Sequence, residues 1–310
     1  MATPVQSFLG GVGLALSVQT LLAINGNVFG ISGFLHRSMR GSQEGAAAVA
    51  GLALGGVLVG FIEGTGPHVV STAWSSLIAS GALVGFGTKL SNGCTSGHMI
   101  CGMSRLSTRS IAATVTFVTA AAATARFLHP SLPPIARTDL SLGAHGAAFL
   151  AGSALALLTT LAIAPSSPVR ADAAPAPTPA RMAVAFFTAL SFALSLRLSN
   201  LVDPLRVLGF LLLPTHPAFD PSLGFLALGA LPLAMLLYRT GRTKVDAQGA
   251  VDARLLVGAA LFGVGWGVEG ICPGPGLVNF GQALAAGSGT TVPLAAWVAA
   301  VVVGGALVPS

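Results

Sequence analysis

The chain has 310 residues, of which 53% are hydrophobic and only 8% are charged. Soluble domains carry about 25% charged residues, so this composition excludes an ordinary soluble protein and indicates a multi-pass protein of the cell membrane (plasma or inner). The 15 basic and 9 acidic residues are scattered between apolar runs without forming a basic block, which argues against a nucleic-acid partner.

Nine apolar runs are long enough to cross a bilayer, since about 17–25 residues span its hydrocarbon core. In chain order they cover residues 7–24, 46–62, 72–90, 109–127, 143–163, 182–198, 222–239, 252–267 and 290–308. Four segments between them are too short to span, at about 28–39, 97–107, 204–213 and 275–286. We therefore predict an all-α polytopic membrane protein of about nine transmembrane helices plus four short re-entrant helices.

The chain contains a duplication. Residues Ser80–Cys94 (SGALVGFGTKLSNGC) and Gly258–Cys272 (GAALFGVGWGVEGIC) place glycines and one cysteine in the same register, 178 residues apart. We predict one membrane domain over 1–310, with half-repeats 1–127 and 180–310 joined by residues 128–181. The joining segment holds the span 143–163 and a Pro/Ala-rich linker. One odd span between the halves turns the second over, which predicts inverted repeats around a central path.

Four polar breaks interrupt the apolar runs, at Asn25–Asn27, Ser91–Cys94, Ser199–Pro204 and Gly270–Pro275. Non-helical backbone at membrane depth is tolerated where it lines a cavity, so the breaks should meet near the midplane. Cap-like residues suggest where the short helices begin: Asn25 or Asn27, Thr95 or Ser96, Asp203, and Pro273 or Pro275. Free N–H groups at such helix starts would receive an anion.

Two segments carry most of the unusual chemistry. Asn92–Ser107 reads NGCTSGHMICGMSRLS, and Gly267–Gly281 reads GVEGICPGPGLVNFG. Both resemble the signature motifs of the YeeE/YedE family of membrane proteins associated with thiosulfate uptake, the first more specifically than the second. The resemblance implies a helical inverted-repeat fold and a thiosulfate-like sulfur anion as substrate. It also implies that Cys94, Cys101 and Cys272 line a narrow path.

The first break departs from the family pattern. It reads INGNVFGISG where another path cysteine is expected, so Asn25, Asn27 or Ser32 would serve instead. The chemistry of thiols suits the substrate, because thiols are weak, polarisable donors and thiosulfate has one soft terminal sulfur. Weak contacts in series let an ion leave as easily as it enters, and the cysteines should stay protonated because a thiolate would repel an anion. An isolated buried cysteine is more often a packing residue, which is the competing interpretation.

Other polar residues of these segments are candidate substrate contacts, with alternatives that remain open. His98 is a substrate donor, a zinc ligand with the three cysteines, or a hydrogen-bonding residue of the break. Lys89 attracts the anion, or it snorkels to the membrane surface or pairs with Glu269, and both charges are expected at membrane depth. Asn92 lies in the second break. We expect no resident metal or cofactor.

Three functions are compatible with these patterns. We favour a permease for a small sulfur anion, most simply thiosulfate, over an enzyme. The alternatives are a membrane thiol redox or sulfur-transfer protein that uses Cys94 and Cys101, and a nonspecific channel. The expected partners are the anion and the lipid bilayer, with a second copy of the chain or a soluble sulfur-handling protein as further candidates.

Overall fold

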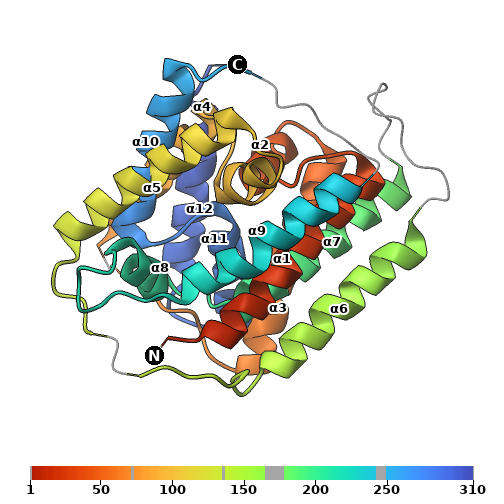
Figure 1. The fold of residues 1–310 in the computed structure, drawn as a ribbon, viewed down its shortest axis with the longest axis horizontal. Coiled ribbons are helices and arrows are strands. Elements are labelled where there is room, and N and C mark those ends of the chain that lie inside the picture. The colour runs from red at the N-terminus through yellow and green to blue at the C-terminus, as the bar shows by residue number, and fades with distance from the viewer. Residues whose placement is uncertain (1, 71–72, 135–136, 165–177, 242–248, 310) are drawn as a thin grey trace.

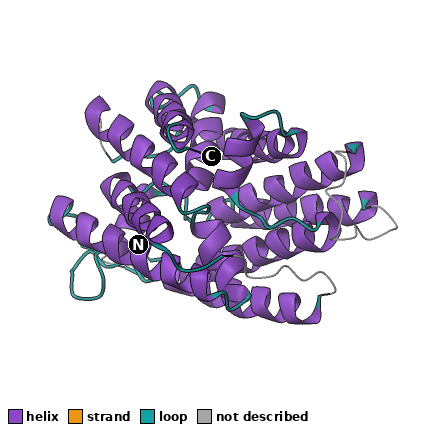
Figure 2. Ribbon diagram, turned by 90° about the horizontal axis from the view of Figure 1, so that it is seen from above, coloured by secondary structure: helices purple, strands orange, loops and turns teal. Residues whose placement is uncertain are grey.

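The computed structural model describes residues 2–70, 73–134, 137–164, 178–241 and 249–309. These residues form helices and connecting loops without a β-strand (Figure 2). In chain order the helices are α1 (Pro4–Asn25), α2 (Ile31–Ser38), α3 (Gln43–Glu63), α4 (Trp74–Leu90), η1 (Thr95–Gly102), α5 (Thr108–Leu128), α6 (Gly146–Ile163), α7 (Pro179–Leu198), α8 (Pro204–Leu211), α9 (Ser222–Thr240), α10 (Ala253–Glu269), α11 (Pro273–Ala285) and α12 (Thr291–Ala306). The predicted all-α fold is confirmed.

Seven segments within the described residues are long and apolar enough to cross a membrane, counting α10 and α11 as one. Helices α4 and α12 have 17 and 16 residues, at the short end of the range for a span. Large apolar side chains such as Leu155, Leu158 and Leu161 of α6 are exposed. A face of this kind is stable against lipid, so the chain is an integral membrane protein.

Each of the four breaks contains one residue with a positive φ angle. Helix α1 ends at Gly26 and α10 at Gly270, both with positive φ, and the loops after α4 and α7 contain Asn92 and Asn200 with φ of 57° and 59°. Glycine and asparagine adopt this left-handed conformation most readily, which is why these residues stop the helices here. A short helix follows each break: α2, η1, α8 and α11.

Asp203 is the predicted cap whose side chain caps its helix in the described structure. Asp203 accepts a hydrogen bond from the Leu205 amide at the start of α8, followed by Pro204. The expectation that Asn25 or Asn27 caps α2 is wrong, because α2 begins after Gly30. The amides of both asparagines donate to the Glu44 carboxylate instead. Helices η1 and α11 begin directly after Cys94 and Cys272, which occupy the N-cap positions.

Helix contacts are reciprocal between the two parts of the chain. The repeat pairs α1 with α7, α3 with α9, α4 with α10 and α5 with α12. Helix α1 packs on α9, and its counterpart α7 packs on α3. In the same way α4 packs on α12, and its counterpart α10 packs on α5. Glycines allow these helices to approach closely. In α4, a Cβ at Gly85 would collide with the backbone of α12, and one at Gly87 with the backbone of α10. In α10, a Cβ at Gly263 would collide with the backbone of α5, and one at Gly265 with the backbone of α4. A two-fold axis would produce this exchange. The division into inverted half-repeats stays a prediction.

Helix α6 is the additional helix between the two sets. It packs on α7 and α1 (Figure 1), where Ser153 shares hydrogen bonds with Ser191 and Ser195. Most of the predicted linker 164–181 lies outside the described residues. The two chain ends lie at opposite ends of the molecule (Figure 1), which defines an N-terminal side and a C-terminal side.

Candidate functional site: a thiol cavity below a cationic vestibule

A small buried cavity, here called the thiol cavity, brings Cys94 and Cys272 together. It measures about 90 Å³ and is otherwise lined largely by apolar side chains, among them Ile31, Phe192 and Trp266. Pockets that take drug-sized molecules run to about 300–1,000 Å³, so this cavity has room for a small ion only. Both cysteines are free and buried. They reach the cavity because each occupies the N-cap of a short helix that follows a break.

Two neighbouring hydroxyl groups contact these thiols. The Thr95 hydroxyl donates to Cys272 Sγ at 3.7 Å, which joins η1 to the start of α11. The Ser96 hydroxyl lies 3.3 Å from Cys94 Sγ and accepts a hydrogen bond from the Ile31 amide at 3.2 Å. A thiol that accepts a hydrogen bond keeps its own S–H free to donate. We predicted that Thr95 or Ser96 caps the short helix, but Cys94 occupies the N-cap position. The hydroxyls of Thr95 and Ser96 contact the two cysteine sulfurs instead.

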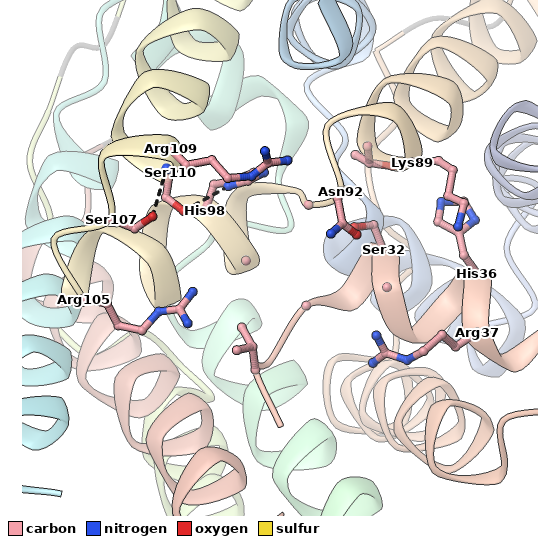
Figure 3. Close-up of a pocket in the computed structure, with 16 residues that line it drawn as sticks. Ser32, His36, Arg37, Lys89, Asn92, His98, Arg105, Ser107, Arg109 and Ser110 are labelled. Atoms are coloured by element: carbon pink, nitrogen blue, oxygen red, sulfur yellow. Dashed lines mark hydrogen bonds between the residues drawn. The ribbon is translucent and has the colours of Figure 1, made fainter. Parts of the chain in front are cut away.

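A larger cavity on the C-terminal side, here called the vestibule, is cationic. It measures about 470 Å³ and takes Arg37 from α2, Lys89 from α4, and Arg105 and Arg109 from around the start of α5. Figure 3 shows these four side chains around a common space. No carboxylate lines this space among the described residues. The vestibule therefore attracts anions.

Backbone carbonyl groups hold part of this cationic lining in place. Arg109 donates to the carbonyls of Ser91 and Ala250, each at 3.0 Å, and Arg105 donates through Nε to Cys101 at 3.0 Å. A neighbouring cavity of about 380 Å³ shares Lys89, Asn92 and Arg109 with the vestibule. It adds two further arginines, Arg40 and Arg254, and one carboxylate, Asp252. The positive charge thus extends to the outer surface.

The predicted candidates Lys89, Asn92 and His98 all line the vestibule. His98 bridges the second break to α5, with Nδ1 3.2 Å from Ser110 Oγ and Nε2 3.3 Å from the Ser91 carbonyl oxygen (Figure 3). Both ring nitrogens therefore have partners, the arrangement of a hydrogen-bonding residue of the break. No cluster of three or more potential metal ligands is present in the described part of the chain.

Four other candidates lie outside both cavities. The Cys101 thiol donates to the Phe29 carbonyl at 3.3 Å, and Asn25 and Asn27 face Glu44. Glu269 is fully buried and accepts a hydrogen bond from Ser76 at 2.5 Å, at the first turn of α4. Lys89 lies at the other end of α4, roughly 20 Å away at 1.5 Å per residue. The alternative in which Lys89 pairs with Glu269 is therefore wrong.

Sequence reasoning missed the three arginines of the vestibule. Arg37, Arg105 and Arg109 come from segments that are distant in the sequence, and each alone is an ordinary charge near a helix end. The available signal is their position: Arg37 lies in the last turn of one short helix, and Arg105 lies shortly after the end of another. Side chains near the ends of these short helices lie beside the vestibule.

Comparison with known proteins identifies one family and several relatives. Residues 180–309 match DUF6691, a family of unknown function. A protein of Xylella fastidiosa strain 9a5c named "Probable transporter" is 44% identical over 123 residues, which cover 39% of this chain and 91% of the relative. A second of the same name and strain is 35% identical over 114 residues, 34% of this chain and 77% of the relative. No solved structure matches. The chain belongs to the same family as these Xylella fastidiosa proteins.

Proposed function

We propose that this protein is a membrane permease for a small sulfur-containing anion, and that thiosulfate is its substrate. The observation that carries the proposal is the thiol cavity, where Cys94 and Cys272 start two matched short helices and face one small space. The names of the related Xylella fastidiosa proteins support transport as the class of function. The resemblance of the two cysteine segments to the YeeE/YedE family supports the choice of thiosulfate.

In this proposal the vestibule collects the dianion and the thiol cavity passes it on. Arg37, Lys89 and Arg109 raise the local concentration of anions at the mouth. In the thiol cavity the soft sulfur of the substrate meets Cys94 and Cys272, and its oxygens meet amide groups at the start of η1 and the Gly274 amide of α11, since Pro273 and Pro275 have no N–H. Because the thiols are weak donors, the ion is held without being trapped.

The direct test is uptake of radiolabelled thiosulfate by liposomes that contain the purified protein. We expect saturable uptake that unlabelled thiosulfate inhibits and sulfate does not, because sulfate lacks the soft sulfur. Equal transport of sulfate and thiosulfate would instead support a nonspecific channel. Rapid alkylation of Cys94 and Cys101 without thiosulfate uptake would support the thiol redox alternative.

The vestibule gives this proposal a salt-dependent signature. We expect the double variant Arg37→Gln, Lys89→Gln to lose about tenfold in initial uptake rate at low ionic strength, the lower end of what charged clefts contribute to association. The loss should shrink at high ionic strength, where the screening length falls from about 30 Å at 0.01 M to about 3 Å at 1 M.

The matched control is Arg126→Gln. Arg126 is an exposed arginine near the end of α5, roughly 25 Å along that helix from Arg109. It should change uptake little at either ionic strength. The vestibule charges would have no such role if the loss of uptake rate in the double variant were the same at low and high ionic strength. An equal loss of uptake rate in the control would contradict it as well.

A further inference from the structure

Two backbone segments separate the vestibule from the thiol cavity. Gly30, Gly93 and Gly97 line the vestibule, while their immediate neighbours Ile31, Cys94 and Ser96 line the thiol cavity. The two cavities therefore lie on opposite sides of the same stretches of chain. The hydrogen bond from the Ile31 amide to Ser96 Oγ ties the two segments together at this level.

Gly30 and Gly97 are half-buried glycines that have room for a side chain. Most buried glycines sit where a Cβ would collide with a neighbouring helix, as Gly56 does with backbone at Val278. Among the described residues, a Cβ at Gly30 meets nothing within 4 Å, and one at Gly97 meets only the Gly30 Cα, at 4.0 Å. Gly30 has φ of −124° and Gly97 lies within η1, so neither backbone conformation requires glycine.

Packing and backbone conformation therefore leave both positions free to carry a side chain. What a side chain would remove is open space at the inner end of the vestibule, since both glycines line it. A single methyl group at Gly97 would already reach van der Waals contact with Gly30 across that space. The two Cα atoms are therefore themselves close to van der Waals contact, and an anion can pass between them only when the two segments move apart.

We infer that Gly30 and Gly97 form the constriction through which an anion leaves the vestibule for the thiol cavity. Because neither residue has a side chain, only backbone must move aside when an anion passes, and the absence of side chains determines the size of anion that the constriction admits. The inference rests on the proposed function, because it assigns the narrowest point of the same path. It involves different residues from the proposed function, because neither glycine contributes a side-chain donor or a charge to the path.

The inference predicts opposite changes in stability and transport. Replacing a helical glycine by alanine at a site with room for Cβ stabilises a protein by restricting its unfolded chain. We therefore expect Gly97→Ala to melt at the wild-type temperature or above, yet to lose about tenfold in thiosulfate uptake, the effect of a modest steric addition to the barrier. Gly30→Val should abolish uptake while the protein still folds.

The matched control is Gly224→Ala in α9, where a Cβ also meets nothing within 4 Å and neither cavity is involved. It should transport normally. The test measures melting temperature and initial uptake for the three variants beside Cys94→Ala. Normal uptake by folded Gly30→Val, with uptake lost in Cys94→Ala, would overturn the constriction and leave the permease standing.

A second measurement does not depend on transport. Gly30→Cys is placed in a chain whose three native cysteines are serine, and the anionic reagent sulfonatoethyl methanethiosulfonate is added on one side of the liposomes at a time. We expect modification from the side of the vestibule only. Ser17→Cys, fully buried between helices, is the unreactive control. An unreactive Cys at position 30 in the folded protein would overturn the inference whatever the substrate is.

Discussion

Replacing Cys94 or Cys272 by alanine is expected to remove most thiosulfate uptake without loss of protein from the membrane. Alanine leaves the substrate with one unpaired end in a small apolar cavity. An unmade polar contact of this kind costs about 1–3 kcal/mol, which corresponds to a roughly five- to more than hundredfold lower rate where it falls on the barrier. Initial uptake by purified variants in liposomes measures this directly.

Serine at the same positions should impair uptake clearly but less. A hydroxyl keeps a donor of similar size, yet it is less polarisable than a thiol and suits the soft sulfur less well. Both variants should fold, because neither cysteine makes a capping hydrogen bond at the helix start that it occupies and each change is small. At position 272 the Thr95 hydroxyl can also donate to a serine oxygen as it does to the sulfur.

A hydroxyl removed elsewhere provides the control. Thr116 bonds only to its own helix α5, and neither cavity includes it, so Thr116→Ala should transport at the wild-type rate. If well-expressed Cys94→Ala and Cys272→Ala proteins also transported at that rate, the thiol path would be wrong. The cysteines would then be packing residues in a membrane helix bundle.

The arrangement of spans and breaks could be read from the sequence because its signals are local. An apolar run of about twenty residues predicts a membrane helix without knowledge of its neighbours. Gly26, Asn92 and Gly270 mark helix ends because these residue types adopt positive φ. The register of the repeat then placed Cys94 and Cys272 in equivalent positions, and in the structure both line the thiol cavity.

The partners of the polar residues could not be read in the same way. Asn25 looked like a cap, but its amide donates to Glu44 and to the backbone of Arg181, 156 positions later in the chain. The vestibule likewise collects charges from α2, α4 and α5. Such contacts depend on which helices are neighbours, and a single sequence carries no direct signal for that.

This polar cluster leads to the second large expected effect, which is on stability. The Glu44 carboxylate lies 3.5 Å from Arg181 Nη2 and accepts hydrogen bonds from the side chains of Asn25 and Asn27. The Arg181 side chain is only 5% exposed, and its Nε and Nη1 atoms have no hydrogen-bond partner among the described residues. The cluster joins α1, α3 and α7 at the C-terminal side.

Glu44→Ala is therefore expected to destabilise the protein strongly. Removing one member of a buried ion pair typically costs about 3–5 kcal/mol, and the partial exposure of Glu44 places this case at the lower end. Thermal unfolding of the purified protein in detergent measures the loss. Asp139→Asn, which changes a partly exposed loop carboxylate whose bond from the Ser141 amide an asparagine oxygen can also accept, is the control.

The double variant Glu44→Gln, Arg181→Met separates the cost of an unpaired charge from general damage at this site. Glutamine can still accept from Asn25 and Asn27, and methionine places no charge in the buried position that Arg181 occupies. Replacing a buried pair by uncharged residues is often neutral, so the double variant should unfold nearer the wild-type temperature than Glu44→Ala. If Glu44→Ala itself unfolded at the wild-type temperature, water would have to hydrate the Arg181 guanidinium in place of Glu44, and the ion pair would not hold the three helices together.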